Sequence, residues 1–334
     1  MHIAIVTPVL DDWDSLQHLL IDLGLLFRGQ AVRLHVLAVD DGSSAAPDID
    51  RFALAPGDPI VELQIVHLAM NLGHQRAIAI GLTEIARRHD IDAVVVMDSD
   101  GEDRPADVTR LLALFRADAP DVIVAARAKR SETPAFKAGY YLYRLLFQLM
   151  TGSRISFGNF SLLSPGAVRR LVRMPELWNN LAGSIMRSRL PRREIPVARG
   201  QRYAGTSRMN FTALIVHGLS AMSIFTDRIF VRILMAAAGL SLCTLLGMVT
   251  VVGMRLFTTL AIPGWASTMS LALLVILIQT GLVVTSVSLL LLGARTNRPV
   301  IPVLDCDSFV LHRQRRLVEG EDLLGLGDRW VAAE

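Results

Sequence analysis

Two long uncharged segments in the last third of the chain constrain its fold more than any other feature. No Asp, Glu, Lys or Arg occurs from Ile233 to Met254, and none occurs from Leu256 to Ala294. An apolar helix of roughly 20 residues crosses a bilayer core of about 30 Å. The second segment contains Pro263-Gly264, which is typical of a turn. We therefore predict membrane spans at about 231–254 and 267–292, and two buried helices of a soluble protein are the less favoured alternative.

The composition of the whole chain agrees with a membrane protein. Hydrophobic residues make up 52% of the 334 residues, and the mean hydropathy of +0.43 is high for a soluble enzyme. The net charge is only +3, and no basic stripe with a reading motif is present, so a nucleic-acid partner is not expected. Cys243 and Cys306 lack metal-ligand spacing, and a disulfide framework is excluded, which suits a reducing compartment.

Basic residues flank the two predicted spans and indicate their orientation. Arg228 and Arg232 precede the first span, Arg295 and Arg298 follow the second, and only Arg255 lies between them. The positive-inside rule places both flanks in the cytosol. The first residues, MHIAIVTPVL, lack the basic region of a signal peptide. We expect a multi-pass protein of the inner or plasma membrane whose large domain is cytosolic.

The first two-thirds of the chain alternates strand and helix patterns. Strands are predicted at Ile3–Val6, Leu34–Val39, Val61–His67, Ala93–Met97 and Asp121–Ala125, and helices at Asp14–Phe27, Gln75–His89 and Ala106–Ala117. Apolar strands separated by helices predict the α/β class, with an open, twisted, mainly parallel sheet that carries helices on both faces. Ligands of such sheets bind beyond the carboxyl ends of the strands.

These patterns predict four regions. Residues 1–210 form a cytosolic domain, 211–229 a juxtamembrane amphipathic helix, 230–294 the two spans, and 295–334 a cytosolic tail that offers no motif and reads as a solvated extension. Tyr140–Met150 is also aromatic and apolar. It fits either the membrane interface or ordinary packing in the protein interior.

Acidic residues follow two of the predicted strands. Asp40-Asp41-Gly42-Ser43 can present carboxylates to a base or a ribose, or can form a plain Asx turn. Asp98 and Asp100 lie two residues apart, so in extended chain both side chains point the same way. Paired carboxylates of this kind suit Mg²⁺ or Mn²⁺ shared with substrate phosphates. The sequence therefore predicts a metal site at Asp98 and Asp100.

Three polar segments complete the set of motifs. Asn71-Leu72-Gly73-His74-Gln75 opens a helix whose N-terminus favours an anion, although Asn71 could equally be only a helix cap. Ser156–Ser161 is a second segment, and the loop Arg199–Met209 (RGQRYAGTSRM) is the third. The arginines of the third loop fit a phosphate group or an anionic lipid, and a solvated basic loop is the alternative.

The order of these motifs resembles family 2 glycosyltransferases of the GT-A fold. The sequence shows T-P-V, D-D-G-S, N-x-G-H-Q, D-x-D, R-Y-x-G-x-S-R and two apolar segments in that order. The narrower resemblance is to the polyisoprenyl-phosphate glycosyltransferases, of the dolichol-phosphate mannosyltransferase and bactoprenol glucosyltransferase type. It covers roughly residues 1–295.

The resemblance implies a role for each motif. Asp40 and Asp41 would hold the base and ribose of a UDP- or GDP-sugar. Asp98 and Asp100 would hold Mg²⁺ or Mn²⁺ and the diphosphate. Asp100, Asp103 and Asn159 would stand at the catalytic positions. Further substrate contacts would come from Pro8, Asn71, Gly73, Ser99, Arg202, Ser207 and Arg208. An inverting transfer of a hexose to a polyprenyl phosphate on the cytosolic face is implied.

Departures from the family pattern keep two alternatives open. Where the family often has G-D-F-R-L, this chain has Gly158-Asn159-Phe160-Ser161-Leu162. Asn159 cannot act as a base, and Ser161 cannot bind phosphate as an arginine does. One alternative is a glycolipid or other hydroxyl acceptor, with Asp103 or Glu102 as base. The other is a non-catalytic scaffold that binds nucleotide or lipid. Small residues at Ala236–Gly239 would also allow homo-oligomers.

Overall fold

The computed structural model describes residues 1–45, 47–54, 57–127, 141, 145–152, 157–204, 218–259, 262, 264–296 and 298–318. The chain divides into two compact units. The first comprises Met1–Gly139, Ile155–Ile224 and Val300–Glu334, and the second comprises Tyr140–Arg154 and Phe225–Pro299. The first unit therefore contains segments from both sides of the apolar region of the sequence.

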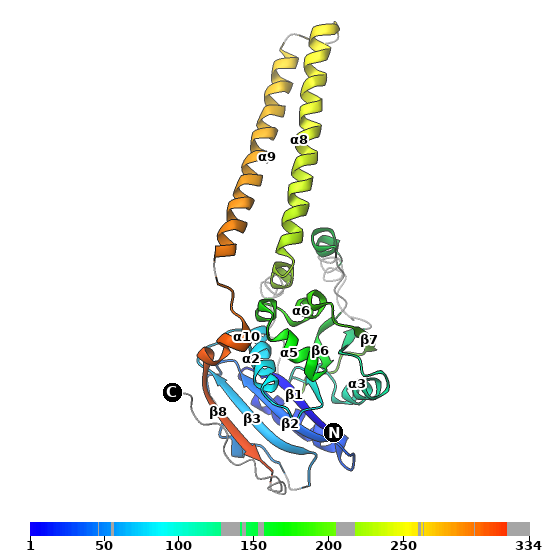
Figure 1. Ribbon diagram of the computed structural model, residues 1–334, viewed down its shortest axis with the longest axis vertical. Coiled ribbons are helices and arrows are strands. Elements are labelled where there is room, and N and C mark those ends of the chain that lie inside the picture. The colour runs from blue at the N-terminus through cyan, green and yellow to red at the C-terminus, as the bar shows by residue number, and fades with distance from the viewer. Residues whose placement is uncertain are drawn as a thin grey trace. The chain divides into compact units, whose positions relative to one another are not determined.

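A mixed, mainly parallel sheet of eight strands forms the centre of the first unit (Figure 1). Its spatial order is β7-β5-β6-β4-β1-β2-β3-β8. Parallel pairs join β1 to β2 and β4, β2 to β3, and β5 to β7. Strands β6 and β8 pair antiparallel with their neighbours. The strands are β1 (His2–Val9), β2 (Arg33–Asp40), β3 (Ile60–Leu68), β4 (Ala93–Val96), β5 (Val122–Arg127), β6 (Phe157–Leu163), β7 (Arg192–Val197) and β8 (Val310–Leu317).

Helices cover both faces of this sheet, because its central strands are apolar on both sides. In β1, Ala4 and Val6 join one buried cluster, while Ile3 and Ile5 join the other. This alternation is the period of two expected of a strand. The α-helices of this unit are α1 (Trp13–Phe27), α2 (His74–Ala86), α3 (Pro105–Asp118), α5 (Pro165–Leu171), α6 (Leu181–Ser188) and α10 (Pro302–Asp305). Short 3₁₀ turns are η1 (Ile49–Arg51), η2 (Pro175–Trp178) and η3 (Cys306–Phe309).

The predicted α/β class and mainly parallel sheet are confirmed. The five expected strands are present, and three further strands, β6, β7 and β8, were not predicted. The last of these changes the interpretation of the tail. Residues 300–318 are no solvated extension, because β8 pairs antiparallel with β3 along its length, and Cys306 is buried in the core. The charged outward residues of β8 concealed the strand pattern.

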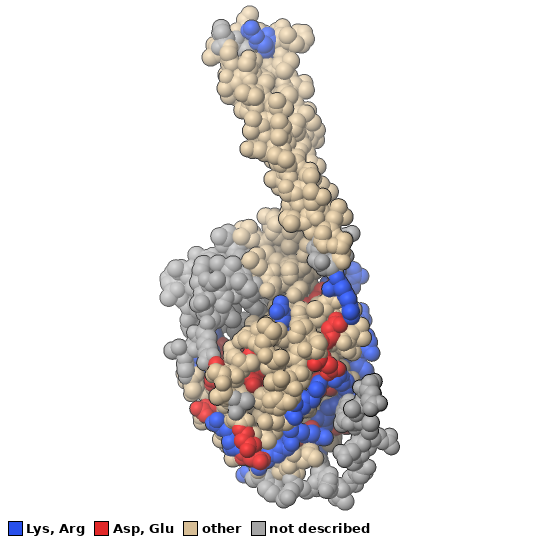
Figure 2. Space-filling model, turned by 90° about the vertical axis from the view of Figure 1, so that its left-hand side faces the viewer, with Lys and Arg blue, Asp and Glu red and all other residues tan. Residues whose placement is uncertain are grey.

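The second unit contains two long helices, α8 (Thr226–Phe257) and α9 (Trp265–Thr296). Both are long and apolar enough to cross a membrane. Large apolar side chains project outward, such as Val249 at 70% exposure and Leu290 at 74%, and Figure 2 shows their surface almost bare of charge. A continuous exposed apolar surface of this kind suits lipid better than water. The two helices also contact each other, and Gly247 faces Leu273.

Candidate functional site

The carboxyl ends of β1, β2 and β4 bring the acidic motifs to one edge of the sheet. Asp41 N–H donates to Val9 O (2.9 Å), and Met97 N–H donates to Val6 O (3.1 Å). The loops that follow β1 and β2 are tied together at Asp11. Its N–H donates to Ser43 Oγ (2.8 Å), and its carboxylate accepts from Ser44 N–H and Oγ–H (both 2.7 Å). Hydrogen bonds between these loops therefore form the base of the site.

Asp40 lies at the end of β2 and its side chain is only 4% exposed. Its Oδ1 accepts from the N–H of Ser43 (2.9 Å), which closes an Asx-type turn. Its Oδ2 lies 2.8 Å from Nδ1 of His67 on β3, whose side chain is 2% exposed. Both oxygens are thus engaged within the protein, and the turn interpretation of the sequence motif applies to this residue.

Asp41 is also turned inward. Its carboxylate accepts from Leu72 N–H (2.7 Å) and Gly73 N–H (2.9 and 3.1 Å), at the start of α2. Burial raises the pKa of Asp41, and these two backbone donors oppose that rise. Gly42 has φ +76°, and a Cβ there would lie 2.7 Å from Asn71 N. Asp41 and Gly42 therefore bind the β2 loop to the Asn71–Gly73 loop.

The second acidic motif is more open. Asp98 and Asp100 are intermediate in burial, whereas Ser99 is buried and donates to Pro8 O (3.3 Å). Burial raises the pKa of Asp100, with the negative charges of Asp98 and Glu102 adding to the rise. Asp103 is buried, and its Oδ2 accepts from Asp98 N–H (3.1 Å). Asp103 thus organises the loop that presents the two partly exposed carboxylates.

A short segment after β7 lies directly on this loop; we call Arg199–Tyr203 the strap. Tyr203 N–H donates to Asp100 O (2.9 Å), and Gly200 N–H donates to Glu102 O (2.8 Å). Gly101 has φ +87°, and a Cβ there would lie 2.8 Å from Gln201 O. The contact is close enough to require glycine at Gly101.

Arg202 of the strap places its guanidinium among the acids. Its Nη1 lies 3.0 Å from Asp100 Oδ2 and 3.8 Å from Glu102 Oε1, and its Nη2 lies 3.7 Å from Asp12 Oδ2. Its Nε is buried without a hydrogen-bond partner in the part of the chain that is described. Arg202 therefore already places positive charge beside these carboxylates. The phosphate or anionic-lipid contact that the sequence predicts for Arg202 stays a prediction. The sequence predicts no role for Asp12, and for Glu102 it offers only the alternative role of base toward a hydroxyl acceptor.

The acids fit the divalent metal that the family resemblance implies. Asp98 and Asp100 supply hard oxygen donors. A cation would relieve the repulsion from Asp98 and Glu102 that adds to the burial-driven rise in the pKa of Asp100. Two protein carboxylates leave coordination positions open for diphosphate oxygens. Among the described residues, His2, His35 and Asp90 form a group of three possible metal ligands away from this site, near the amino ends of the strands. In that group Asp90 forms an ion pair with Arg88 at 2.6 Å.

The predicted residue Asn159 meets another motif. Gln75 on α2 donates to Asn159 Oδ1 (2.9 Å), and its own Oε1 accepts from Leu181 N–H (2.8 Å) at the start of α6. Ser161 is buried and donates to Asn159 O (2.9 Å). In this arrangement Gln75 links α2 to Asn159 on β6 and to the start of α6. The predicted residues Ser207 and Arg208 lie outside the described residues.

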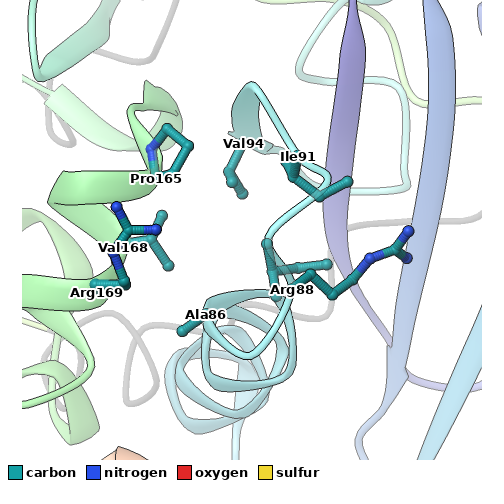
Figure 3. A pocket seen from close by; sticks show the side chains of 8 residues that line it. Ala86, Arg88, Ile91, Val94, Pro165, Val168 and Arg169 are labelled. Carbon is teal, nitrogen blue, oxygen red and sulfur yellow. The ribbon is translucent and has the colours of Figure 1, made fainter. Parts of the chain in front are cut away.

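The enclosed cavity between α2, β4 and α5 is not a substrate site (Figure 3). Its volume is about 10 Å³, roughly the space of one water molecule. Its lining includes Ile91, Val94 and Val168.

Comparisons with known proteins identify the family of this chain. The family model described as "Glycosyl transferase family 2" matches residues 5–172. The chain is 28% identical over 227 residues to an undecaprenyl-phosphate 4-deoxy-4-formamido-L-arabinose transferase of Enterobacter sp. (strain 638), covering 64% of each chain. It is 25% identical over 247 residues to a bactoprenol glucosyl transferase of Shigella phage SfX, covering 72% of this chain and 79% of the relative.

A solved structure of glucosyl-3-phosphoglycerate synthase from Mycobacterium tuberculosis is also similar. It has 14% identity and a TM-score of 0.48, over 68% of this chain and 79% of that one. The family match spans β1 to α5, including both acidic motifs. The chain therefore belongs to glycosyl transferase family 2.

Proposed function

We propose that this glycosyltransferase is anchored in a membrane by α8 and α9 and moves a hexose from a nucleotide-diphosphate sugar to a polyprenyl phosphate. The observation that carries the proposal is the group of partly exposed acids, Asp98, Asp100 and Glu102, at the carboxyl edge of the sheet. The polyprenyl acceptor is supported by the relatives, whose names specify undecaprenyl phosphate and bactoprenol.

The donor half of the site would use a metal together with Arg202. Mg²⁺ or Mn²⁺, held by Asp98 and Asp100, supplies Lewis-acid stabilisation of the departing diphosphate when bound. Arg202 lies within 3.0 Å of Asp100 and can add donors to the same phosphates. Asp40 and Asp41 would shape the nucleotide pocket from beneath, because both are nearly fully buried. Less buried residues next to Asp40 and Asp41 would make the direct contacts with the nucleotide.

The arrangement around Asp103 favours a phosphate acceptor over a hydroxyl acceptor. A hydroxyl nucleophile needs a base within hydrogen-bond reach. Asp103 is 4% exposed and bound to Asp98 N–H, and Glu102 is paired with Arg199 at 2.6 Å. A phosphate acceptor is already anionic and needs positioning rather than deprotonation. We also propose that the substrate-binding positions predicted from the sequence contact the donor or the acceptor.

A thermal-shift screen tests the donor half of this proposal. UDP- and GDP-sugars are added to the purified full chain with and without Mn²⁺, and stabilisation is expected only when nucleotide and metal are both present. Product mass spectrometry tests the acceptor half. A sugar phosphodiester is expected, whereas an ordinary glycoside would point to a hydroxyl acceptor. No stabilisation by any of these donors would contradict the proposal.

The domain boundaries predicted from the sequence also remain proposals. They place a cytosolic enzyme domain before about residue 210 and membrane spans between 230 and 294. The joining of residues 310–317 to the sheet extends the enzyme domain to include part of the tail. Since both flanks of the apolar region belong to one unit, the proposal requires both flanks to lie on the same side of the membrane.

A further inference from the structure

The C-terminal strand carries a histidine that stacks on a buried histidine beneath the site. His312 on β8 stands opposite His67 on β3 in the antiparallel register, and Figure 1 shows the two strands side by side at one edge of the sheet. The two imidazole rings lie 4.2 Å apart between centroids, with an interplanar angle of 16°. This contact joins the tail to a strand that ends at the candidate site.

His67 is held by few contacts. Its Nδ1 lies 2.8 Å from Asp40 Oδ2, while its Nε2 is buried without a hydrogen-bond partner among the described residues. Leaving a buried polar atom unpaired is unfavourable, so other contacts must fix the ring in this orientation. Those contacts are the bond to Asp40, the stacked ring of His312, and the tilted ring of Trp13 at 6.4 Å.

A continuous series of contacts leads from His67 to the open part of the site. Asp40 accepts from Ser43 N–H (2.9 Å), and Ser43 Oγ accepts from Asp11 N–H (2.8 Å). The next residue, Asp12, faces Arg202 at 3.7 Å. Each contact restricts a loop that borders the acids, so the orientation of His67 bears on the shape of the pocket.

We propose that His312 is a positioning residue of the donor site. It holds the ring of His67, and His67 holds Asp40 and the turn that ends at Ser43. His312 itself touches no substrate in this scheme. The inference rests on the proposed function, because it takes the edge formed by these loops as the place where the nucleotide binds.

Strand β8 is anchored by other contacts, so the role of His312 can be separated from that of the strand. Arg315 lies 2.6 Å from Glu62, and Ala69 N–H donates to Phe309 O (2.9 Å). Loss of the His312 ring should leave these bonds in place. Loss of the Arg315 side chain should weaken the strand and leave the histidine stack in place.

The test measures the Kd of UDP and of GDP, each with Mn²⁺, and the Tm of the full chain. His312→Ala should raise the Kd of whichever nucleotide binds by about tenfold, which corresponds to about 1.4 kcal/mol. His312→Val, which keeps strand propensity, should do the same. His312→Phe keeps a stacking ring and should stay within about twofold of the wild type. Arg315→Ala should lower the Tm and leave the Kd unchanged.

Each outcome either supports or overturns the positioning role of His312. A wild-type Kd in folded His312→Ala or His312→Val overturns the inference. So does a Kd raised as far by His312→Phe or by Arg315→Ala, because the effect would then not depend on the ring stack. If the wild type binds neither nucleotide, the proposed function fails instead, which is a separate result from failure of the positioning role.

Discussion

The carboxylates at the edge of the sheet fall into two kinds according to burial. Asp40 and Asp41 are 3% exposed and bind backbone amides and His67. Asp100 is more open, with a side chain 15% exposed, and it faces a guanidinium rather than backbone alone. A buried carboxylate whose oxygens are all hydrogen-bonded within the protein organises loops, whereas a partly exposed one beside other carboxylates is suited to bind a cation.

Asp100→Asn tests whether the partly exposed carboxylate at this position binds the metal. The substitution removes one negative charge from the proposed metal site at almost constant volume, so turnover should fall on the order of a hundredfold or more. The rate of sugar transfer at saturating Mn²⁺ checks this. Asp118→Asn alters an exposed acid on α3 and should leave the rate unchanged. Wild-type turnover in Asp100→Asn would remove this residue from the site.

Gly101→Ala tests the seating of the strap. The added Cβ would lie 2.8 Å from Gln201 O and 2.9 Å from the Tyr203 ring, at φ +87°. Unfolding free energy should fall by about 1–3 kcal/mol, as measured by urea titration. Gly158→Ala is the matched control, since its Cβ meets nothing within 4 Å. Equal stability of the two variants would show that the strap does not pack as described.

At the scale of elements, β8 is the strand whose removal should matter most. It covers the edge of β3 and pairs Arg315 with the buried Glu62. A chain that ends at Pro299 would expose that edge and remove the Arg315 charge that pairs with buried Glu62, so we expect a lower Tm and aggregation. A chain that ends at Val318 is the control and should match the wild type. Size-exclusion profiles and Tm values check this, and a stable chain ending at Pro299 would contradict it.

Glu62 makes the stability of this part of the sheet pH-dependent. Burial alone would raise the pKa of Glu62, but its bonds to His35 and Arg88 and the charge of Arg315 lower that pKa from 4.5 to about 2. A lowered carboxyl pKa stabilises the fold above the unfolded-state pKa, and the contribution is lost as pH falls through the folded-state pKa.

Glu62→Gln should therefore cost on the order of 3 kcal/mol near pH 7. The difference from the wild type should shrink between pH 4.5 and about 2. Urea midpoints measured across this range check the expectation. A difference that is the same at pH 2 and pH 7 would mean that the Glu62 charge is not the cause.

Burial explains why β1 and β2 could be predicted from the sequence while β7 and β8 could not. Strand β1 is apolar on both faces and was recognisable from sequence, and so was β2. Strands β7 and β8, RREIPV and VLHRQRRL, expose much of their length and carry no apolar period. Their positions are set by neighbours distant in sequence, such as Glu62 for Arg315, which local patterns do not encode.

The site could be predicted only in part for a similar reason. The positions of Asp98 and Asp100 after a buried strand indicated an acidic edge. The inward orientation of Asp40 depends on His67, 27 residues further along the chain, and no motif marks His67. The association of Arg202 with Asp100 depends on packing of the strap against Gly101.

At the scale of the whole molecule, the apolar segment is an insertion within one unit, because residues on both sides of it join the same sheet. A hairpin that spans the membrane twice satisfies this topology. In a background of Cys243→Ser and Cys306→Ala, Thr259→Cys should react in intact cells with an impermeant maleimide. Ser44→Cys should react only after permeabilisation. The reverse pattern would contradict the predicted orientation.

The transfer reaction itself tests the proposed function most directly. Purified full chain is incubated with undecaprenyl phosphate, Mn²⁺ and a panel of radiolabelled UDP- and GDP-sugars, and label in the organic phase is counted. We expect one donor to give an organic-extractable product, which is lost with a chelator or with Asp100→Asn. Absence of label from every donor, or label that persists after Asp100→Asn, would contradict metal-dependent transfer to a polyprenyl phosphate.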